Sequence, residues 1–206
     1  VFRFNRAFLL LIDREKKNLV GRIAFGPSSP EEAGLIWNRV KQLPRAESLS
    51  STLKTYLKYS GEGEIQANQI AQRLGIPLSQ ESSILVQAIQ KRRAIVVQGV
   101  KPEDTFDPSI LQVLGNEYFA VIPLLVQNES IGVLVVDNII THRPIQKDDI
   151  QLLEILTAQA ALAIAHADAM EQLDRKVQEI ESAYSELRAS HEKLIEASKF
   201  AALGQM

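Results

Sequence analysis

The sequence predicts an α+β fold, in which an antiparallel sheet is flanked by helices and a long C-terminal helix follows. Strand-like apolar runs come in pairs joined by short polar turns, which is typical of hairpins and therefore of an antiparallel sheet. Helical segments are grouped between these pairs, and this segregation separates α+β from α/β folds. The last sixty residues, 147–206, contain no proline and a single glycine, Gly204, as expected of one helix.

The N-terminal part of the chain predicts the first hairpin and a helix. Apolar runs at 7–13 and 19–25 flank a short charged turn, so we expect two paired strands. Ser29 is a favourable N-cap for a helix over 30–43, which begins with one proline and is ended by another.

The middle of the chain predicts several short helices and one strand. We expect helices at 52–59, 65–74, 83–90 and 109–114 and a strand at 94–98. Gly75 and Gly115 follow two of these helices and are suited to the left-handed conformation that ends a helix.

A second hairpin is predicted after the short helices. Strands at 118–126 and 131–136 flank the polar turn 127–130. Pro123 lies inside the first of these strands and cannot donate a ladder hydrogen bond, so we expect it at an edge or a bulge.

Within the long helix, apolar residues recur at alternating spacings of three and four, the heptad pattern of a coiled coil. A dimer seam of two parallel copies would contain Met170, Leu173, Val177, Ile180, Tyr184, Leu187, His191 and Leu194. A long helix packed within one chain is the alternative. Residues 150–164 are too rich in apolar side chains for a two-residue seam, so we expect that part to pack broadly on its own sheet.

Composition excludes several classes of function. The chain has no cysteine, which removes disulfides, thiolate metal sites and cysteine nucleophiles, and its three histidines are scattered, so we expect no metal. A formal net charge of −2 argues against nucleic-acid binding. No uninterrupted apolar run approaches the ~20 residues that span a bilayer, so we expect no membrane segment and a cytoplasmic location.

The segment VIPLL, a short turn, IGVLVVDN and the acidic start of the terminal helix together resemble a GAF domain over about residues 1–168. We expect the usual N-terminal helix of that fold to be missing from this sequence or cut off. The resemblance implies a ligand cavity between the sheet and the helices and loops on one face. Candidate lining residues are Arg22, Phe25, Trp37, Phe106, Ile110 and Leu111. Arg22 is a charge inside a strand run, so it meets either an anionic ligand group or solvent. The ligand stays unknown, and no cofactor is implied.

Asn138 and Asp149 correspond to two members of the motif of cyclic-nucleotide-binding GAF domains. The lysine and the glutamate of that motif are replaced here by Ile139 and Ile150. We therefore interpret Asp149 as a helix cap and Asn138 as a turn residue. The cysteine-dependent activities of some GAF proteins are excluded by composition.

The segment KLIEASKFAALGQM resembles the opening of the dimerisation and phosphoacceptor helix of sensor histidine kinases. We therefore expect a sensor domain over 1–168, a coiled-coil signalling helix over 169–194 and the truncated start of the kinase helix over 195–206. His191 precedes the resembling segment, so we do not expect it to be phosphorylated.

This organisation predicts a signal-sensing and dimerising module with no catalytic activity of its own. The parent kinase would act on a response regulator. Two alternatives stay open. One is a ligand-free dimerisation or spacer domain. The other is a DNA-binding regulator, since QIAQRLGIP (69–77) resembles half of a helix-turn-helix, although its basic residues are at the wrong end of the following helix.

Overall fold

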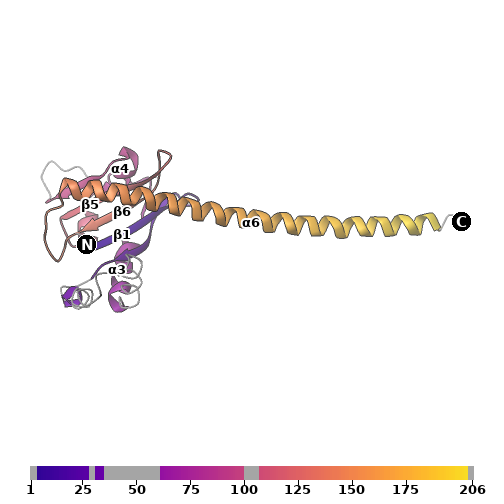
Figure 1. Ribbon diagram of the computed structural model, residues 1–206, viewed down its shortest axis with the longest axis horizontal. Coiled ribbons are helices and arrows are strands. Elements are labelled where there is room, and N and C mark those ends of the chain that lie inside the picture. The colour runs from indigo at the N-terminus through magenta and orange to yellow at the C-terminus, as the bar shows by residue number, and fades with distance from the viewer. Residues whose placement is uncertain (1–3, 28–30, 35–60, 100–106, 204–206) are drawn as a thin grey trace, which may run out of the picture. The chain divides into compact units, whose positions relative to one another are not determined.

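The computed structural model describes residues 4–27, 31–34, 61–99 and 107–203, and Figure 1 shows its elements. Within these residues the strands form one six-stranded sheet in the order β3-β2-β1-β6-β5-β4. All five pairings in it are antiparallel, which confirms the predicted sheet type. The strands are β1 (Arg6–Asp13), β2 (Asn18–Phe25), β3 (Ile76–Pro77), β4 (Ile95–Gln98), β5 (Tyr118–Val126) and β6 (Glu129–Asp137).

Both predicted hairpins are present, β1 with β2 and β5 with β6. Pro123 pairs with Val133 of β6, while β4 ends opposite Val121. Beyond that point β5 has a strand on one side only among the described residues, so the expected edge position of the proline is confirmed. The short strand β3 was not predicted. It pairs with Asn18 and Leu19 of β2 directly after a helix ends.

The described helices are α3 (Gly61–Arg73), α4 (Ile84–Lys91), α5 (Ser109–Leu114) and α6 (Lys147–Leu203). Ser83 caps α4, since its hydroxyl accepts a hydrogen bond from the Leu85 N–H. Gly115 ends α5 in the left-handed conformation at φ 65°, as predicted. Residues 31–34 are helical, whereas the rest of the helix predicted over 30–43 and the helix at 52–59 fall outside the described residues.

Alternate residues of the strands enter two separate cores, one on each face of the sheet. On the first face Phe8, Phe119 and Val135 pack with residues of α3, α4 and α5. On the opposite face Ala120 and Val136 pack with the beginning of α6. The sheet therefore separates the helices α3–α5 from the beginning of α6.

The first part of α6 corrects the expectation of broad packing on the sheet. Only a narrow stripe of it is buried, formed by Ile150, Leu153, Thr157 and Ala161. Large apolar residues on its other side stay exposed, namely Leu152, Ile155, Leu156 and Leu162. One helix can bury only the side that faces the sheet, so the surplus apolar residues remain at the surface.

The segment Lys147–Arg188 of α6 is long and apolar enough to cross a bilayer by length and composition, with a mean hydropathy of 1.4 in its most apolar stretch. The expectation of no membrane segment considered only uninterrupted apolar runs, and it stays a prediction. Ile150, Leu153 and Ala161 of this segment are nevertheless buried within the domain, and a core helix of a soluble protein passes the same test.

The chain divides into two compact units, Val1–Leu162 and Ala163–Met206. The first contains the sheet, α3–α5 and the beginning of α6. The second contains the remainder of α6.

Gly21 permits the close approach of α3 to β2. A Cβ atom at this position would lie 2.0 Å from the carbonyl oxygen of Ala71, which is backbone and cannot turn away. We expect Gly21→Ala to lower the free energy of unfolding by about 1–3 kcal/mol, since a packed interface must shift to admit the methyl group. Urea denaturation measures this loss. Gly34→Ala is the matched control, because a Cβ there meets nothing within 4 Å. Equal losses for both variants would contradict the proposed close packing.

Candidate functional site

The connection between β6 and α6 is held by the side-chain amides of two asparagines. Asn5, just before β1, accepts hydrogen bonds at Oδ1 from the N–H groups of Ile140 (3.0 Å) and Thr141 (2.9 Å). Asn138 accepts from the Asn5 N–H (3.2 Å) and donates from Nδ2 to the Arg143 carbonyl (3.1 Å). The N-terminal segment therefore fixes the chain immediately before α6.

A buried ion pair lies next to these asparagines. Arg6 and Asp137 are paired across β1 and β6, and only 3% and 0% of their surfaces are exposed. The Arg6 Nε donates to both carboxylate oxygens, at 3.1 and 3.0 Å, and Nη2 donates to Oδ2. The guanidinium carbon also lies 5.2 Å from the centroid of the Phe8 ring, within the range of a cation–π interaction.

This ion pair connects α5 to the start of α6. The Arg6 Nη2 donates to the carbonyl of Leu114, the last residue of α5, at 2.6 Å. That carbonyl is one of those that a helix end leaves without an internal partner. The Asp137 Oδ1 accepts from the Ile139 N–H at 3.3 Å. A continuous hydrogen-bonded path thus runs from α5 on one face of the sheet to the loop that begins α6.

Burial and hydrogen bonding shift the pKa values of Asp137 and Asp107 in opposite directions. Burial raises the pKa of Asp137, while the Arg6 guanidinium and the Ile139 N–H oppose the rise. Hydrogen bonds from Ser109 lower the pKa of Asp107, whose Oδ1 accepts the Ser109 N–H at 2.8 Å. Asp107 therefore stabilises the beginning of α5, and the Arg6–Asp137 pair stabilises its end.

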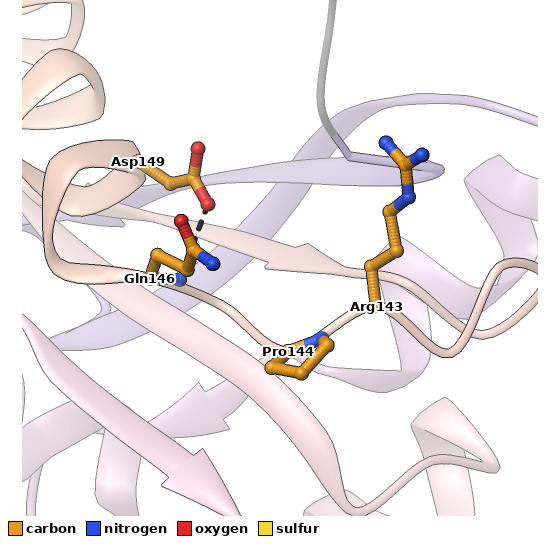
Figure 2. A pocket seen from close by; sticks show the side chains of 4 residues that line it. All are labelled: Arg143, Pro144, Gln146 and Asp149. Atoms are coloured by element: carbon orange, nitrogen blue, oxygen red, sulfur yellow. Dashed lines mark hydrogen bonds between the residues drawn. The ribbon is translucent and has the colours of Figure 1, made fainter.

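Asp149 caps α6, as predicted, since its Oδ2 accepts the Gln146 N–H at 3.1 Å. A pocket of about 230 Å³ lies beside this cap, and Figure 2 shows the residues that line it, Arg143, Pro144, Gln146 and Asp149. Its volume is below the ~300 Å³ of ordinary small-molecule sites, and its buried carboxylate is already engaged. The hydrogen bonds of Asn138 and Asp149 confirm the structural roles expected for both, and we assign no ligand to this pocket.

The predicted ligand-cavity residues differ in their environments. Ile110 is buried in the core beside α5, and Leu111 packs against the same core. Phe25 is half-buried on β2. Arg22 lies at the irregularity in the β1–β2 pairing with its side chain exposed, so it does not join Ile110 in the core. Trp37 and Phe106 lie outside the described residues, so a cavity shared by all six stays a prediction.

The predicted seam residues share one property, a high exposure in the single chain. The exposed fractions run from 45% for Val177 to 69% for Tyr184, and His191 is also exposed. Leu194 lies in α6, but its side chain is outside the described residues. The pairing of two chains along this stripe remains a prediction.

Sequence reasoning did not single out Arg6 and Asp137. Each is a charged residue at one end of an apolar strand, and this is the one local signal that they carry. Their meeting depends on the pairing of the first strand with the last long strand, which no local pattern specifies.

Comparison with known proteins identifies the family. Residues 30–164, more than half of the chain, match the family described as GAF domain. The chain belongs to the GAF domain family. GAF domains are signal-sensing modules found in sensor kinases and other proteins, and they are not catalysts in that role. No curated protein sequence matches the chain.

Several solved structures share this GAF fold at low sequence identity. Residues 122 to 287 of a methyl-accepting chemotaxis protein align with a TM-score of 0.53 and 19% identity, covering 82% of this chain and 83% of that one. A GAF domain/HD domain protein from Geobacter sulfurreducens aligns at 0.52 and 14%, covering 82% and 84%. The GAF domain of a two-component sensor histidine kinase from Bacillus halodurans aligns at 0.50 and 20%, covering 82% and 87%.

Removing the guanidinium should make folding depend on pH. In Arg6→Met, Asp137 stays buried without its cation, so its pKa rises further above that of the unfolded chain. A carboxyl with a raised folded-state pKa favours folding when protonated, and that stability is lost as pH rises through the folded pKa. We expect the variant to lose about 3–5 kcal/mol near neutral pH and less near pH ~5. Urea denaturation across this range measures the difference.

The double variant Arg6→Met/Asp137→Leu is the matched control. It removes both charges, so its stability should recover toward that of the wild type and vary less with pH. A single variant whose stability does not change between the two pH values would contradict an ionised, buried Asp137.

Proposed function

We propose that this GAF domain is the cytoplasmic sensing and dimerisation module of a two-component sensor histidine kinase. In this proposal a small-molecule or partner signal alters the GAF domain, and two copies of α6 carry the change to the kinase as a parallel coiled coil. Two-state signalling needs only a difference in ligand affinity between two arrangements of the helices. The response regulator would be a partner of the full-length parent, not of this segment.

The observation that carries the proposal is the exposed apolar stripe of α6. Met170, Leu173 and Ile180 are 61%, 57% and 67% exposed. Exposing such large apolar side chains to water is unfavourable in free energy. Pairing with the identical stripe of a second copy would bury them. The spacing of three and four matches the a and d positions of a heptad, which favours helix-on-helix pairing.

The kinase context is supported by two separate likenesses. The segment KLIEASKFAALGQM resembles the start of a kinase dimerisation helix. One of the similar solved structures is itself described as a GAF domain of a two-component sensor histidine kinase. A short motif and a shared fold favour this context over the DNA-binding alternative, for which the basic residues are poorly placed.

The hydrogen-bonded path from α5 to the start of α6 supports a route for the signal. A ligand on the face of the sheet covered by α3–α5 would move α5, and the Leu114 carbonyl is held by Arg6. Arg6 holds Asp137, and the next residue, Asn138, holds the Arg143 carbonyl in the loop before α6. In this proposal the GAF domain transmits a shift of α5 to α6 through the plane of the sheet.

A ligand-free spacer domain is the main alternative. Mass spectrometry of small molecules that co-purify with the natively expressed protein distinguishes the two. A stoichiometric ligand supports sensing by a bound molecule. A protein that repeatedly purifies without one, and whose melting temperature no metabolite mixture raises, supports the spacer.

Charges in the seam should separate the two copies. We expect Val177→Asp/Ile180→Asp to convert the dimer to a monomer, because each substitution places an unpaired carboxylate in an apolar seam. Sedimentation velocity at micromolar concentration measures the change. The control is Ser182→Asp/Ser185→Asp, which adds two charges at positions outside the a/d stripe and should leave the dimer intact. A wild-type chain already monomeric at high micromolar concentration would refute the coiled coil.

Insertions should test whether α6 transmits rotation. In the full-length kinase, four residues inserted after Ala169 turn the following helix by only roughly 40°, whereas two turn it by roughly 200°. We expect the four-residue insertion to preserve ligand-dependent kinase activity and the two-residue insertion to uncouple or invert it. Autophosphorylation assays with and without the signal measure both. Equal, signal-responsive activity in the two variants would mean that α6 is only a tether.

A further inference from the structure

Basic residues from two distant segments gather at the end of the sheet where the β5–β6 hairpin turns. All six are exposed, and they are Arg14, Lys16, Lys17, Lys91, Arg92 and Arg93. The Nη2 of Arg14, in the β1–β2 turn, lies 3.1 Å from the Glu129 carboxylate, and the hydroxyl of Ser130 donates to the Ile89 carbonyl of α4 at 3.1 Å. The β1–β2 turn and the end of α4 therefore lie beside the same hairpin turn. We call this region, residues 13–17, 91–93 and 127–130, the basic end.

The basic end is not neutralised by its own carboxylates. It holds six basic and three acidic side chains, a net charge of +3 in a chain whose formal total is −2. Two of the three acidic side chains already face a cation, at Arg14 and Lys16. Within the described part of the chain, the side chains of Lys17, Arg92 and Arg93 have no hydrogen bond or ion pair. These three charges are therefore available to a partner.

Two of the unpaired basic residues occupy backbone positions that favour glycine. Lys17 has a φ of 53°, and Arg92, which ends α4, has a φ of 51°. Residues with a Cβ atom are disfavoured in this left-handed region, where glycine or asparagine is usual. The dipole of α4 favours a cation at its end, but it does not explain Lys17, which is in no helix. A binding role accounts for basic residues that are kept in a strained conformation at both positions.

The width of the basic end indicates a macromolecular partner. Arg14 follows β1 and Arg93 precedes β4, and β6 and β5 lie between these two strands in the sheet. Neighbouring strands are ~4.8 Å apart, so the charges extend over roughly 14 Å. A small anion would contact one or two of the basic side chains, whereas a chain of several negative charges can contact most of them.

Among extended anions, an acidic polypeptide matches the basic end best. The exposed carboxylates of Glu15 and Glu129 lie among the cations, and they would be repelled by the uniform negative charge of a bilayer or a nucleic-acid backbone. The basic end also contains no apolar side chain that could enter a bilayer. Half of its cations are arginines, which bind carboxylates through two parallel hydrogen bonds.

We propose that the basic end of this GAF domain is a docking surface for an acidic polypeptide segment of a partner protein. Lys17, Arg92 and Arg93 are its main contacts. An extended segment of about five residues, or a helix of about ten, spans the width of the surface. None of the six basic residues belongs to the predicted seam of α6, so this docking goes beyond the proposed function and does not depend on it.

Fluorescence anisotropy with a labelled hexaglutamate peptide tests the proposal on the full chain. We expect the wild type to bind this peptide, more weakly as salt is added, and not to bind a labelled hexaglutamine peptide. Lys17→Gly/Arg92→Gly should bind hexaglutamate about fivefold or more weakly, because two exposed ion pairs are lost. Glycine relieves the backbone at both positions, so the urea midpoint of this variant should be equal to or higher than that of the wild type. A loss of binding then cannot come from misfolding.

Arg143→Gln/Lys147→Gln is the matched control. It removes two exposed positive charges from the loop before α6 and the first turn of α6, outside the basic end, and should bind hexaglutamate like the wild type. The proposal is overturned if the glycine variant binds as tightly as the wild type or if the control loses as much affinity. It is also overturned if hexaglutamate binds no better than hexaglutamine.

Two further probes distinguish the other anionic partners. Vesicles of phosphatidylcholine and phosphatidylglycerol, or a short single-stranded DNA, should bind more weakly than hexaglutamate, and tighter binding of either one overturns the choice of a polypeptide. The seam variant Val177→Asp/Ile180→Asp should bind hexaglutamate like the wild type. A monomeric wild-type chain that binds the peptide refutes the coiled coil alone, and a dimer that does not bind it refutes the docking surface alone.

Discussion

The antiparallel pairing of β1 with β6 is the interaction on which the rest of the domain depends. It joins the first hairpin to the second, and without it the sheet would separate into two three-stranded halves. The same pairing places Arg6 opposite Asp137, so the two charges are buried together. Because a buried charge without its partner is strongly unfavourable, the pair makes one register of the central strands far better than its neighbours. The stability of the sheet and the proposed signal route thus depend on the same pair of residues.

Much of the fold follows from local sequence. The two hairpins and the glycine that ends α5 are each specified within a few residues, and all were predicted. β3 was missed because two residues carry no periodicity, and only the proximity of Leu19 makes Ile76 part of the sheet. The first part of α6 was misjudged for a related reason. The apolar content of a segment indicates how much apolar surface burial would favour. It does not indicate how much of that surface one sheet can cover.

The site was less predictable than the fold. The structural roles of Asn138 and Asp149 were expected, since a capping aspartate and a turn asparagine are recognised by position in the chain. The Arg6–Asp137 pair was not, because it requires two distant strands to be neighbours in one register. Arg22 was chosen as a charge inside a strand, but the irregular pairing of β1 with β2 at that point leaves its side chain in solvent. Sequence indicates which residues are unusual, and topology decides which of them meet.

Thr157 has a consequence for the mechanics of α6. It is a buried polar residue on the face toward the sheet, yet its hydroxyl donates to carbonyls of its own helix, Leu153 at 2.8 Å and Glu154 at 3.1 Å. Ile150 and Leu153 make apolar contacts with the sheet, which have no preferred direction, whereas the first turn is held by the directional hydrogen bond of Asp149. The start of α6 is therefore oriented by a directional hydrogen bond, whereas its buried apolar side chains add non-directional packing against the sheet.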